Sequence, residues 1–314
     1  MTIVSPSQSS IDQAAKTLRD GGIVAFATET VYGLGCDTFN LDAINLVYAT
    51  KGRPIHNPMI AHILDSGWVT QVTDEWNDQC SRLAEAFWPG PLTIVLPKKD
   101  NVPSSACGGR NTIAIRCPSH PVARQLLTRF NKPISAPSAN KSGYVSPTTA
   151  KHVDEEFNGD VCVIDGGPCE EGIESTVLSL VGKPSILRPG TITQHAIEKI
   201  IGSVTQTKRT IQGDSPGTAQ QHYAPLTNAT LVTTDELNLV DDEHCVALAI
   251  FGNPQLAKRC VRMPSTPKEY GAMLYMVLRE VDGESVSRII IEQPPTTPHW
   301  IAIQDRLNRC TATG

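Results

Sequence analysis

The sequence lacks the features of membrane, secreted and strongly basic proteins. None of its apolar runs reaches the roughly 18 residues of a membrane-spanning helix, and its first ten residues resemble no signal peptide. Its net charge of −5 argues against an extended basic surface for nucleic acid or lipid. We therefore expect a cytoplasmic protein that does not bind membranes and whose contacts with RNA are at most local and weak.

Its nine cysteines include no C-x-x-C pair, which favours neither a zinc knuckle nor a disulfide framework. We expect reduced, mostly buried thiols and no metal site built from protein ligands. What the sequence does contain is ordinary for a globular protein, with 40% hydrophobic and 19% charged residues. A length of 314 residues is typical of two domains.

Hydrophobic periodicity predicts an α/β protein in two parts. Helical spacing of apolar residues predicts helices at 11–18, 42–49, 81–88, 121–130, 193–201, 270–281 and around 300–307. Short apolar runs predict strands at 23–26, 60–63, 93–96, 112–116, 161–164, 176–181, 185–187, 246–251 and 288–291. Residues 203–219 show no periodicity and are interpreted as part of a linker. The predicted division is a domain at 1–205, a linker at 206–224 and a smaller βαβ-type domain at 225–314.

Familiar nucleotide and hydrolase fingerprints are missing. Gly33-x-Gly35 has no third glycine at position 38, no P-loop glycine precedes Gly182-Lys183, and neither H-E-x-x-H nor G-x-S-x-G occurs. The sequence therefore gives no support to a dinucleotide, P-loop, zincin or α/β-hydrolase site. We expect the polar stretch 28–35 after the first strand to be a loop.

Two fixed cations, Lys51 and Arg53, flank Gly52 at the end of the helix predicted at 42–49. Their charge, and a glycine that allows close backbone approach, suit the oxygens of a triphosphate. The alternative is a solvated helix end, where basic residues complement the helix dipole.

Other polar residues follow apolar runs in the same way. Ser138 and Asn140 follow the segment 132–134, while Arg116 and Arg188 close predicted strands. They could orient a ligand and bind phosphate or carboxylate; the alternatives are an ordinary turn and surface ion pairs. His62 lies inside an apolar run, where it is either a substrate contact or a core histidine.

Together these clusters carry a family resemblance. The segments are ATETVYGLG (27–35), KGRP (51–54), NP (57–58), WPGPLT (88–93), IRCP (115–118), APSAN (136–140), SPT (146–148), EST (174–176) and LRPG (187–190). In this order they resemble the threonylcarbamoyl-AMP synthases, the YrdC-like family, over residues 11 to about 201. The segment from SPG (215–217) to QHYAP (221–225) looks like the linker of the long, two-domain form. The resemblance implies a twisted mixed sheet with flanking helices and a smaller Rossmann-like α/β carboxy-terminal domain.

The resemblance also implies a reaction. Enzymes of this family condense ATP, L-threonine and bicarbonate or CO2 into threonylcarbamoyl-AMP and pyrophosphate. The product is passed to the machinery that modifies an adenosine beside the anticodon of tRNA. Mg²⁺ is expected with ATP from the chemistry of phosphates rather than from a protein motif.

Site residues follow from the same resemblance. The signature group is Lys51, Arg53, Ser138 and Asn140. The implied ATP contacts are Arg53, Asn57, Thr112, the backbone at Ala136, Ser146, Arg188 and Tyr223. The implied threonine contacts are Thr30, His62, Arg116, Ser138 and Ser175. The linker around Tyr223 would close over the nucleotide, although TAQQ at 218–221 departs from the basic or bulky residues usual there. Ala27 also stands where the family usually has proline.

Two other functions are compatible with parts of the pattern. A non-catalytic RNA-binding or ribosome-associated relative would need a local basic patch, because the charges of residues 1–224 and 225–314 sum to −2 and −3. A carbamoyl-transfer relative that acts in metal-cofactor assembly usually carries extra acylphosphatase and zinc-finger modules, and no C-x-x-C occurs here. The synthase interpretation explains more of the residues than either.

Overall fold

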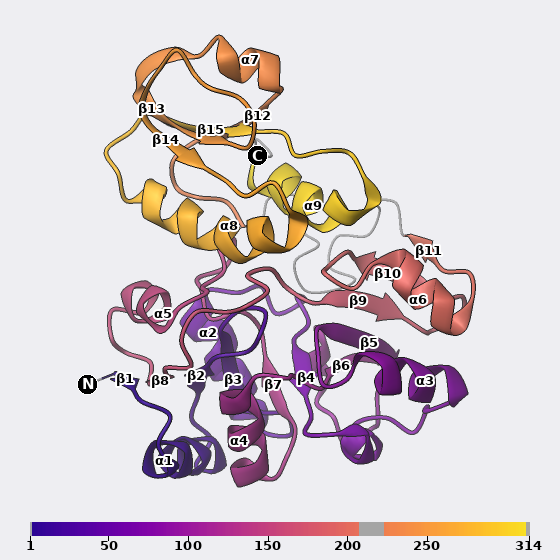
Figure 1. Ribbon diagram of the computed structural model, residues 1–314. Helices are drawn as coiled ribbons and strands as arrows, with labels where there is room; N and C mark the ends of the chain where they lie inside the picture. Colours follow the sequence, from indigo (N-terminus) through magenta and orange to yellow (C-terminus); the bar gives the residue numbers. More distant parts are fainter. Residues whose placement is uncertain (1, 207–222, 312–314) are drawn as a thin grey trace.

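A computed structural model describes residues 2–206 and 223–311 of the chain. Its strands form two separate sheets, which lie at opposite ends of the molecule in Figure 1. Most of the predicted linker, residues 207–222, lies outside the described residues. Among the described residues, no helix is long and apolar enough to cross a membrane.

Within residues 2–206 the larger sheet has eleven strands, in the order β1-β8-β2-β3-β7-β4-β6-β5-β9-β10-β11. The sheet contains parallel pairs such as β4 with β6 and antiparallel pairs such as β5 with β6, so the predicted mixed sheet is confirmed. The bounds are β1 (Ile3–Val4), β2 (Val24–Phe26), β3 (Gly33–Asp37), β4 (Ile60–His62), β5 (Leu92–Pro97), β6 (Thr112–Arg116), β7 (Ile134–Ala136), β8 (Val163–Ile164), β9 (Thr176–Ser179), β10 (Ser185–Arg188) and β11 (Thr205–Gln206).

Helices flank this sheet on two faces. The apolar stripes of α1 and α4 pack together against one face in a shared cluster, and the two helices lie side by side in Figure 1. Helix α2 begins at an Asn40 cap and ends at Gly52, whose φ of 59° closes the last turn. The bounds are α1 (Gln8–Arg19), α2 (Leu41–Lys51), η1 (Ser66–Gln71), α3 (Asp78–Phe87), η2 (Ser104–Cys107), α4 (Pro121–Phe130), α5 (Ala150–Glu156) and α6 (Gln194–Ile201).

The smaller sheet is entirely parallel, with the strand order β12-β15-β13-β14. This arrangement confirms the predicted second, Rossmann-like α/β region. Figure 1 shows α8 and α9 between this sheet and the larger one, so both helices face the first part of the chain. The bounds are β12 (Ala229–Val232), α7 (Thr234–Asn238), β13 (Asp241–Ala249), β14 (Leu256–Arg262), α8 (Pro267–Asp282), β15 (Arg288–Glu292), η3 (Pro298–Trp300) and α9 (Ile301–Cys310).

The expected loop at 28–35 is wrong over its last residues, because β3 begins at Gly33. A Cβ atom at Gly35 would come within 2.7 Å of both Ile134 and Phe26. Glycine is therefore required at this position for β3 to pack closely against its neighbours. Because glycine is uncommon inside strands, it also makes the strand harder to predict from the sequence. Strand β11 likewise falls inside the segment interpreted as linker, where its exposed residues show no apolar alternation.

Candidate active site

The carboxyl-proximal ends of several central strands surround a narrow, charged cavity of about 40 Å³. Its walls come from β3, β4, β6, β7 and β10 and from the segments that precede β3 and β9. Loops at strand ends are where α/β proteins place binding groups. The lining residues are Thr28, Thr30, Val31, Gly33, Arg53, Ile60, His62, Arg116, Ala136, Pro137, Ser138, Glu174, Ser175, Arg188 and Tyr223.

Arg53 reaches this cavity from the turn that follows α2. Its side chain is buried, with Nη2 donating to the carbonyl of Pro58 at 3.0 Å and Nε to that of Asn57 at 3.3 Å. Burial lowers the pKa of Arg53 to about 10, so the guanidinium keeps its charge at neutral pH. Arg53 is therefore a fixed cation that a phosphate can approach.

Lys51 is placed differently from the prediction. Its Nζ donates to the carbonyl of Ser138 at 2.6 Å and to that of Asn140, and the side chain is 1% exposed and outside the cavity lining. Burial, with Arg53 nearby, holds the pKa of Lys51 well below its usual value. Contact between Lys51 and a triphosphate is therefore not available in this conformation. Its Nζ fixes the segment 138–140 instead, because both of its carbonyl partners lie there.

Ser138 and Asn140 end the β7 segment on the opposite wall. Ser138 forms a bridge with Gly33 of β3 and lines the cavity. The Asn140 amide donates to the carbonyls of Lys141 and Tyr144 at 2.7 and 2.9 Å, away from the cavity. Asn140 thus stabilises the turn, while Ser138 is part of the cavity lining.

Arg116 ends β6 and points into the cavity in a buried ion pair. Its Nη2 lies 2.7 Å from Glu29 Oε1, and its Nη1 donates to Thr30 Oγ1 at 2.8 Å. Burial alone would raise the pKa of Glu29, but Arg116 lowers it on balance, so the carboxylate of Glu29 is charged. Two fixed partners hold the guanidinium fork in one orientation, which suits a carboxylate ligand.

His62 at the end of β4 lies beside Arg116 in the same wall. Its Nδ1 is 3.3 Å from the carbonyl of Ile134, and its ring meets Phe26 edge-on at 6.0 Å. Burial, and next the charge of Arg116, lower the pKa of His62 to about 3. The ring is therefore neutral at physiological pH and offers a hydrogen bond rather than a charge.

The buried, neutral His62 makes stability depend on pH. Because the unfolded chain takes up this proton near pH 6.5 and the folded chain only near pH 3, stability is fully present above pH 6.5 and falls as the pH drops. We expect the free energy of unfolding of the wild type to fall by about 1.4 kcal/mol per pH unit between about pH 6 and 4. His62→Asn should remove this contribution. Denaturant unfolding of both proteins at several pH values measures this difference; parallel curves would contradict it.

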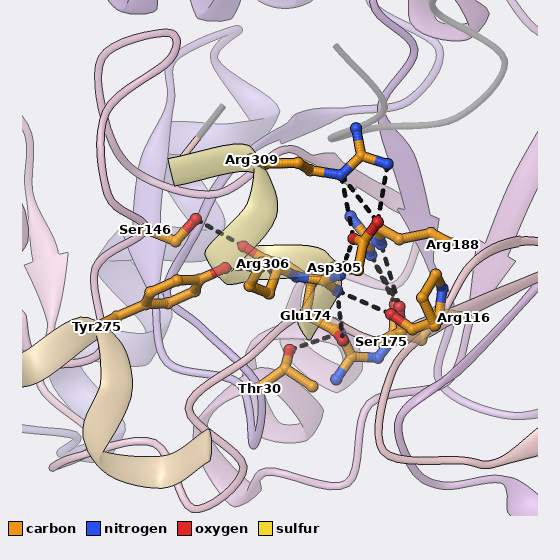
Figure 2. A network of polar contacts seen from close by, with 11 residues as sticks. Thr30, Arg116, Ser146, Glu174, Ser175, Arg188, Tyr275, Asp305, Arg306 and Arg309 are labelled. Atoms are coloured by element: carbon orange, nitrogen blue, oxygen red, sulfur yellow. Dashed lines mark hydrogen bonds and ion pairs between the residues drawn. The ribbon is translucent and has the colours of Figure 1, made fainter. Parts of the chain in front are cut away.

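Ser175 and Arg188 complete the cavity at β9 and β10. Arg188 donates through Nε and Nη2 to the Ser175 carbonyl at 3.2 and 3.0 Å, and through Nη2 to its hydroxyl at 3.2 Å. Ser175 Oγ also lies 2.7 Å from Thr93 Oγ1 on β5. Figure 2 shows Arg188 and Ser175 close to Arg116, so cations from two walls converge on the cavity.

Nine predicted site residues line the cavity and five do not. Those in the lining are Thr30, Arg53, His62, Arg116, Ala136, Ser138, Ser175, Arg188 and Tyr223. Those outside it are Lys51, Asn57, Thr112, Asn140 and Ser146. Asn57 offers its carbonyl to Arg53, Thr112 begins β6 at the end remote from Arg116, and Ser146 donates to Glu174 at 2.7 Å.

Sequence reasoning missed four residues that shape this region. Thr28 bonds to Thr30 within the lining, and Glu29 orients Arg116. Arg306 and Tyr275 bond to Glu174 from α9 and α8, more than a hundred positions away. The one available signal was that Arg306 shares a helical face with the apolar residues Ile303, Leu307 and Cys310.

The chemistry of this cavity is electrostatic. Three buried arginines and the buried carboxylate of Glu174 line the cavity together with neutral hydroxyls and a neutral histidine, and the lining holds no cysteine. Such a site can bind small molecules that carry phosphate and carboxylate groups and can stabilise negative charge that develops on them. Fold and site therefore define an α/β protein with a cationic site suited to small anionic molecules.

Comparison with known proteins assigns the chain to a family. Residues 16–190 match the Sua5–YciO–YrdC family model, described as telomere recombination, and residues 192–312 match the model described as the C-terminal domain of threonylcarbamoyl-AMP synthase. The threonylcarbamoyl-AMP synthase of Pyrococcus abyssi is 36% identical over 95% of this chain and 93% of the relative. That of Bacillus subtilis is 37% identical over 97% and 93%.

A solved structure agrees over both parts of the fold. The crystal structure of P. abyssi Sua5 complexed with L-threonine superposes with a TM-score of 0.93 at 34% identity, covering 99% of this chain and 98% of that one. The chain belongs to the threonylcarbamoyl-AMP synthase family, in its two-domain form. The predicted fold class and family are both confirmed.

Proposed function

We propose that this chain joins L-threonine, bicarbonate or CO2 and ATP into threonylcarbamoyl-AMP, with release of pyrophosphate. When bicarbonate is the source, it takes up a proton and releases water to give CO2. The threonine nitrogen then bonds to the carbon of CO2 and loses a proton to solvent, which gives a carbamate. A carbamate oxygen then attacks the α-phosphorus, and the bond from that phosphorus to the pyrophosphate oxygen breaks. The observation that carries the proposal is the convergence of Arg53, Arg116 and Arg188 on one buried cavity in a chain of this family.

The threonine end of the site is proposed around Arg116. Its guanidinium, already fixed by Glu29 and Thr30, is the partner for the threonine carboxylate. Thr30, His62, Ser138 and Ser175 are the remaining proposed contacts, because all of them line the cavity. A neutral His62 can hydrogen-bond the hydroxyl or the amine without repelling a positive charge.

The ATP end is proposed around Arg53 and Arg188. Both guanidiniums are buried and line the cavity, so they can stabilise charge on the α-phosphate and on departing pyrophosphate. Ala136 contributes backbone and Tyr223 an aromatic ring to the same lining. Lys51 and Asn140 act indirectly in this proposal, since they hold the segment that presents Ser138. Direct ATP contacts by Asn57, Thr112 and Ser146 stay predictions.

The proposed reaction uses Mg²⁺ that arrives bound to ATP. Among the described residues, no group of three or more His, Cys, Asp or Glu side chains could hold a metal ion. The two carboxylates nearest the cavity, Glu29 and Glu174, already pair with Arg116 and Arg306. We therefore propose that Mg²⁺ is bound by the phosphates of ATP and belongs to the substrate.

The division of labour along the chain is also a proposal. Residues 1–205 would form the catalytic domain, 225–314 the carboxy-terminal domain, and 206–224 a linker over the site. Two described residues support the last part: Tyr223 lines the cavity, and the Ala224 amide donates to the Gly143 carbonyl at 3.0 Å. Because Tyr223 is part of the cavity lining, we propose that the segment around it moves when substrates bind.

The product would be passed in the cytoplasm to the enzymes that transfer the threonylcarbamoyl group to tRNA adenosine beside the anticodon. Direct binding of tRNA would be weak, because both parts of the chain are net negative.

The threonine hydroxyl is expected to be essential for selection. An analogue that lacks the hydroxyl leaves buried polar groups of the site without a hydrogen-bond partner. Sites built to bind a hydroxyl therefore reject such an analogue by about 10⁴-fold. We expect 2-aminobutyrate to support pyrophosphate release with a kcat/KM at least about 100-fold below that of threonine. Equal values for the two amino acids would contradict the proposed threonine pocket.

The function itself is tested by leaving out one substrate at a time. Purified protein with ATP, Mg²⁺, L-threonine and bicarbonate should release pyrophosphate, and omission of either threonine or bicarbonate should abolish the release. Release that is equal without threonine would overturn the proposal. Tight binding of tRNA without any turnover of ATP would support the alternative, a non-catalytic RNA-binding relative.

A further inference from the structure

The segment 172–175, which carries Ser175 into the site, is held from the carboxy-terminal part of the chain. At Gly172, with φ of 67°, a Cβ atom would come within 2.3 Å of the Gly271 carbonyl in α8. Ile173 packs in the hydrophobic cluster of the second region together with Tyr270 and Leu274. Backbone and side chain of this segment therefore rest on α8 rather than on the larger sheet alone.

The carboxylate of Glu174 is the centre of this contact. Oε1 accepts from Ser146 Oγ at 2.7 Å, while Oε2 accepts from Arg306 Nε at 2.8 Å and from Tyr275 OH at 3.1 Å. The Arg306 side chain is fully buried and that of Glu174 is 8% exposed. Figure 2 shows α8 and α9 bringing Tyr275 and Arg306 to Glu174 from the carboxy-terminal side.

Arg306 also holds a second segment of the site. Its Nη2 donates to the carbonyl of Pro189 at 3.0 Å and, more weakly, to that of Glu174 at 3.4 Å. One guanidinium thus joins the residue before Ser175 to the residue after Arg188. The bond between Arg188 and the Ser175 carbonyl joins the same two segments on the cavity side.

The orientation of Arg306 is itself fixed on two sides. Nη1 lies 2.7 Å from Asp305 Oδ2, and the guanidinium lies 5.3 Å from the centre of the Tyr223 ring. That ring stacks on Tyr275 at 5.6 Å. Burial would raise the pKa of Glu174, but Arg306 and Arg188 lower it to about 2. The carboxylate is therefore charged, and its geometry depends on the cation that faces it.

We propose that Arg306 and Tyr275 are positioning residues through which the carboxy-terminal region sets the geometry of Ser175 and Arg188. Neither residue lines the cavity, so they act through Glu174 and Pro189. This inference rests on the proposed synthase activity. In this proposal the carboxy-terminal region affects catalysis by positioning site residues, without contacting the substrate.

Arg306→Met tests the proposal, with Glu292→Gln as its matched control. Removing Arg306 takes away one of the links between the two segments, and a displacement of about 1 Å at reacting groups can reduce turnover about 100-fold. Glu292 is also a buried charge of the second region, but it accepts from the amides of Ile250, Phe251 and Gly252, remote from the cavity. We expect both variants to lower the melting temperature and only Arg306→Met to lower kcat/KM, by about 100-fold.

A milder variant keeps the test decisive if Arg306→Met fails to fold. Tyr275→Phe retains the stack on Tyr223 and loses one hydrogen bond to Glu174, so we expect a three- to tenfold lower kcat/KM, roughly the value of one bond. Arg306→Lys should keep part of the activity, since an ammonium cannot reproduce the fork that reaches both segments. The double variant Glu174→Gln/Arg306→Met should lose no more than Arg306→Met alone.

The outcomes separate this inference from the proposed function. If wild-type protein shows no threonine-dependent release of pyrophosphate, the function fails and no variant needs to be compared. If the wild type is active, unchanged kcat/KM in Tyr275→Phe and in any folded Arg306 variant overturns the positioning role. Equal losses of activity in Glu292→Gln and Arg306→Met, in proportion to melting temperature, also overturn it, because that pattern reports stability alone.

Discussion

Replacing Arg53 with alanine is expected to lower kcat by about 10²- to 10³-fold, the usual cost of removing one preorganised group that stabilises charge in a transition state. Arg53 is buried and lines the cavity, and its two bonds to backbone carbonyls hold it in place before substrate arrives. Because pyrophosphate gains negative charge as it leaves, the loss should appear in kcat more than in the KM for threonine. Steady-state pyrophosphate release measures both constants.

Arg110→Ala is the matched control for this prediction. Arg110 donates to the carbonyl of His56 at 2.8 Å, in the same turn, but it is outside the cavity lining. The control should keep kcat within about twofold, since surface substitutions of this kind are usually nearly neutral. If Arg53→Ala retains wild-type kcat, the proposed stabilisation of phosphate charge by Arg53 is wrong.

Replacing Arg116 with glutamine is expected to raise the KM for threonine by about 100-fold, with a much smaller change in the KM for ATP. A charge-assisted bond to a buried ligand group is worth about 1.5 to 3 kcal/mol. The same change leaves the buried carboxylate of Glu29 without its cation. Removing one partner of such a buried pair lowers the free energy of unfolding by about 3 to 5 kcal/mol.

A double variant separates binding from stability at this position. Glu29→Gln/Arg116→Gln removes both charges, so we expect it to recover most of the stability while the KM for threonine stays high. Isothermal titration with threonine and denaturant unfolding measure the two effects. Wild-type affinity for threonine in either Arg116 variant would contradict the role of Arg116 as the carboxylate partner.

The elements that sequence reasoning predicted correctly share a strong local pattern. Helices α1, α4 and α8 have apolar residues at helical spacing along one face, and all three lie within two or three residues of their predicted bounds. The elements that it missed have no such pattern. Strand β14 is mostly exposed at the edge of its sheet. Strand β3 contains two glycines, and at Gly35 its neighbours leave no room for a Cβ atom.

The site was predictable where its residues lie next to one another in sequence. Clusters such as 136–140 and 187–190 stand at strand ends, where the fold brings them together at the cavity. Lys51 shows the limit of this reasoning, since its spacing from Arg53 suggested a shared ligand. Because α2 ends at Gly52, the two side chains point in different directions. Lys51 contacts the segment 138–140, and Arg53 lines the cavity.

Arg306 could not be recognised from local sequence, because its partner Glu174 lies 132 positions away. A basic residue in an amphipathic helix is ordinarily a solvated one. Only the packing of α9 against the first part of the chain turns Arg306 inward, where the buried carboxylate of Glu174 compensates its charge.

The account is tested most directly by following labelled bicarbonate into the product. Protein is incubated with ATP, Mg²⁺, L-threonine and ¹³C-bicarbonate, and the nucleotides are analysed at once by mass spectrometry. The account predicts a threonylcarbamoyl-AMP that carries the ¹³C label, formed in equal amount with pyrophosphate and strongly reduced in Arg53→Ala. Pyrophosphate released without the labelled adenylate, or no adenylate at all from folded wild-type protein, would contradict it.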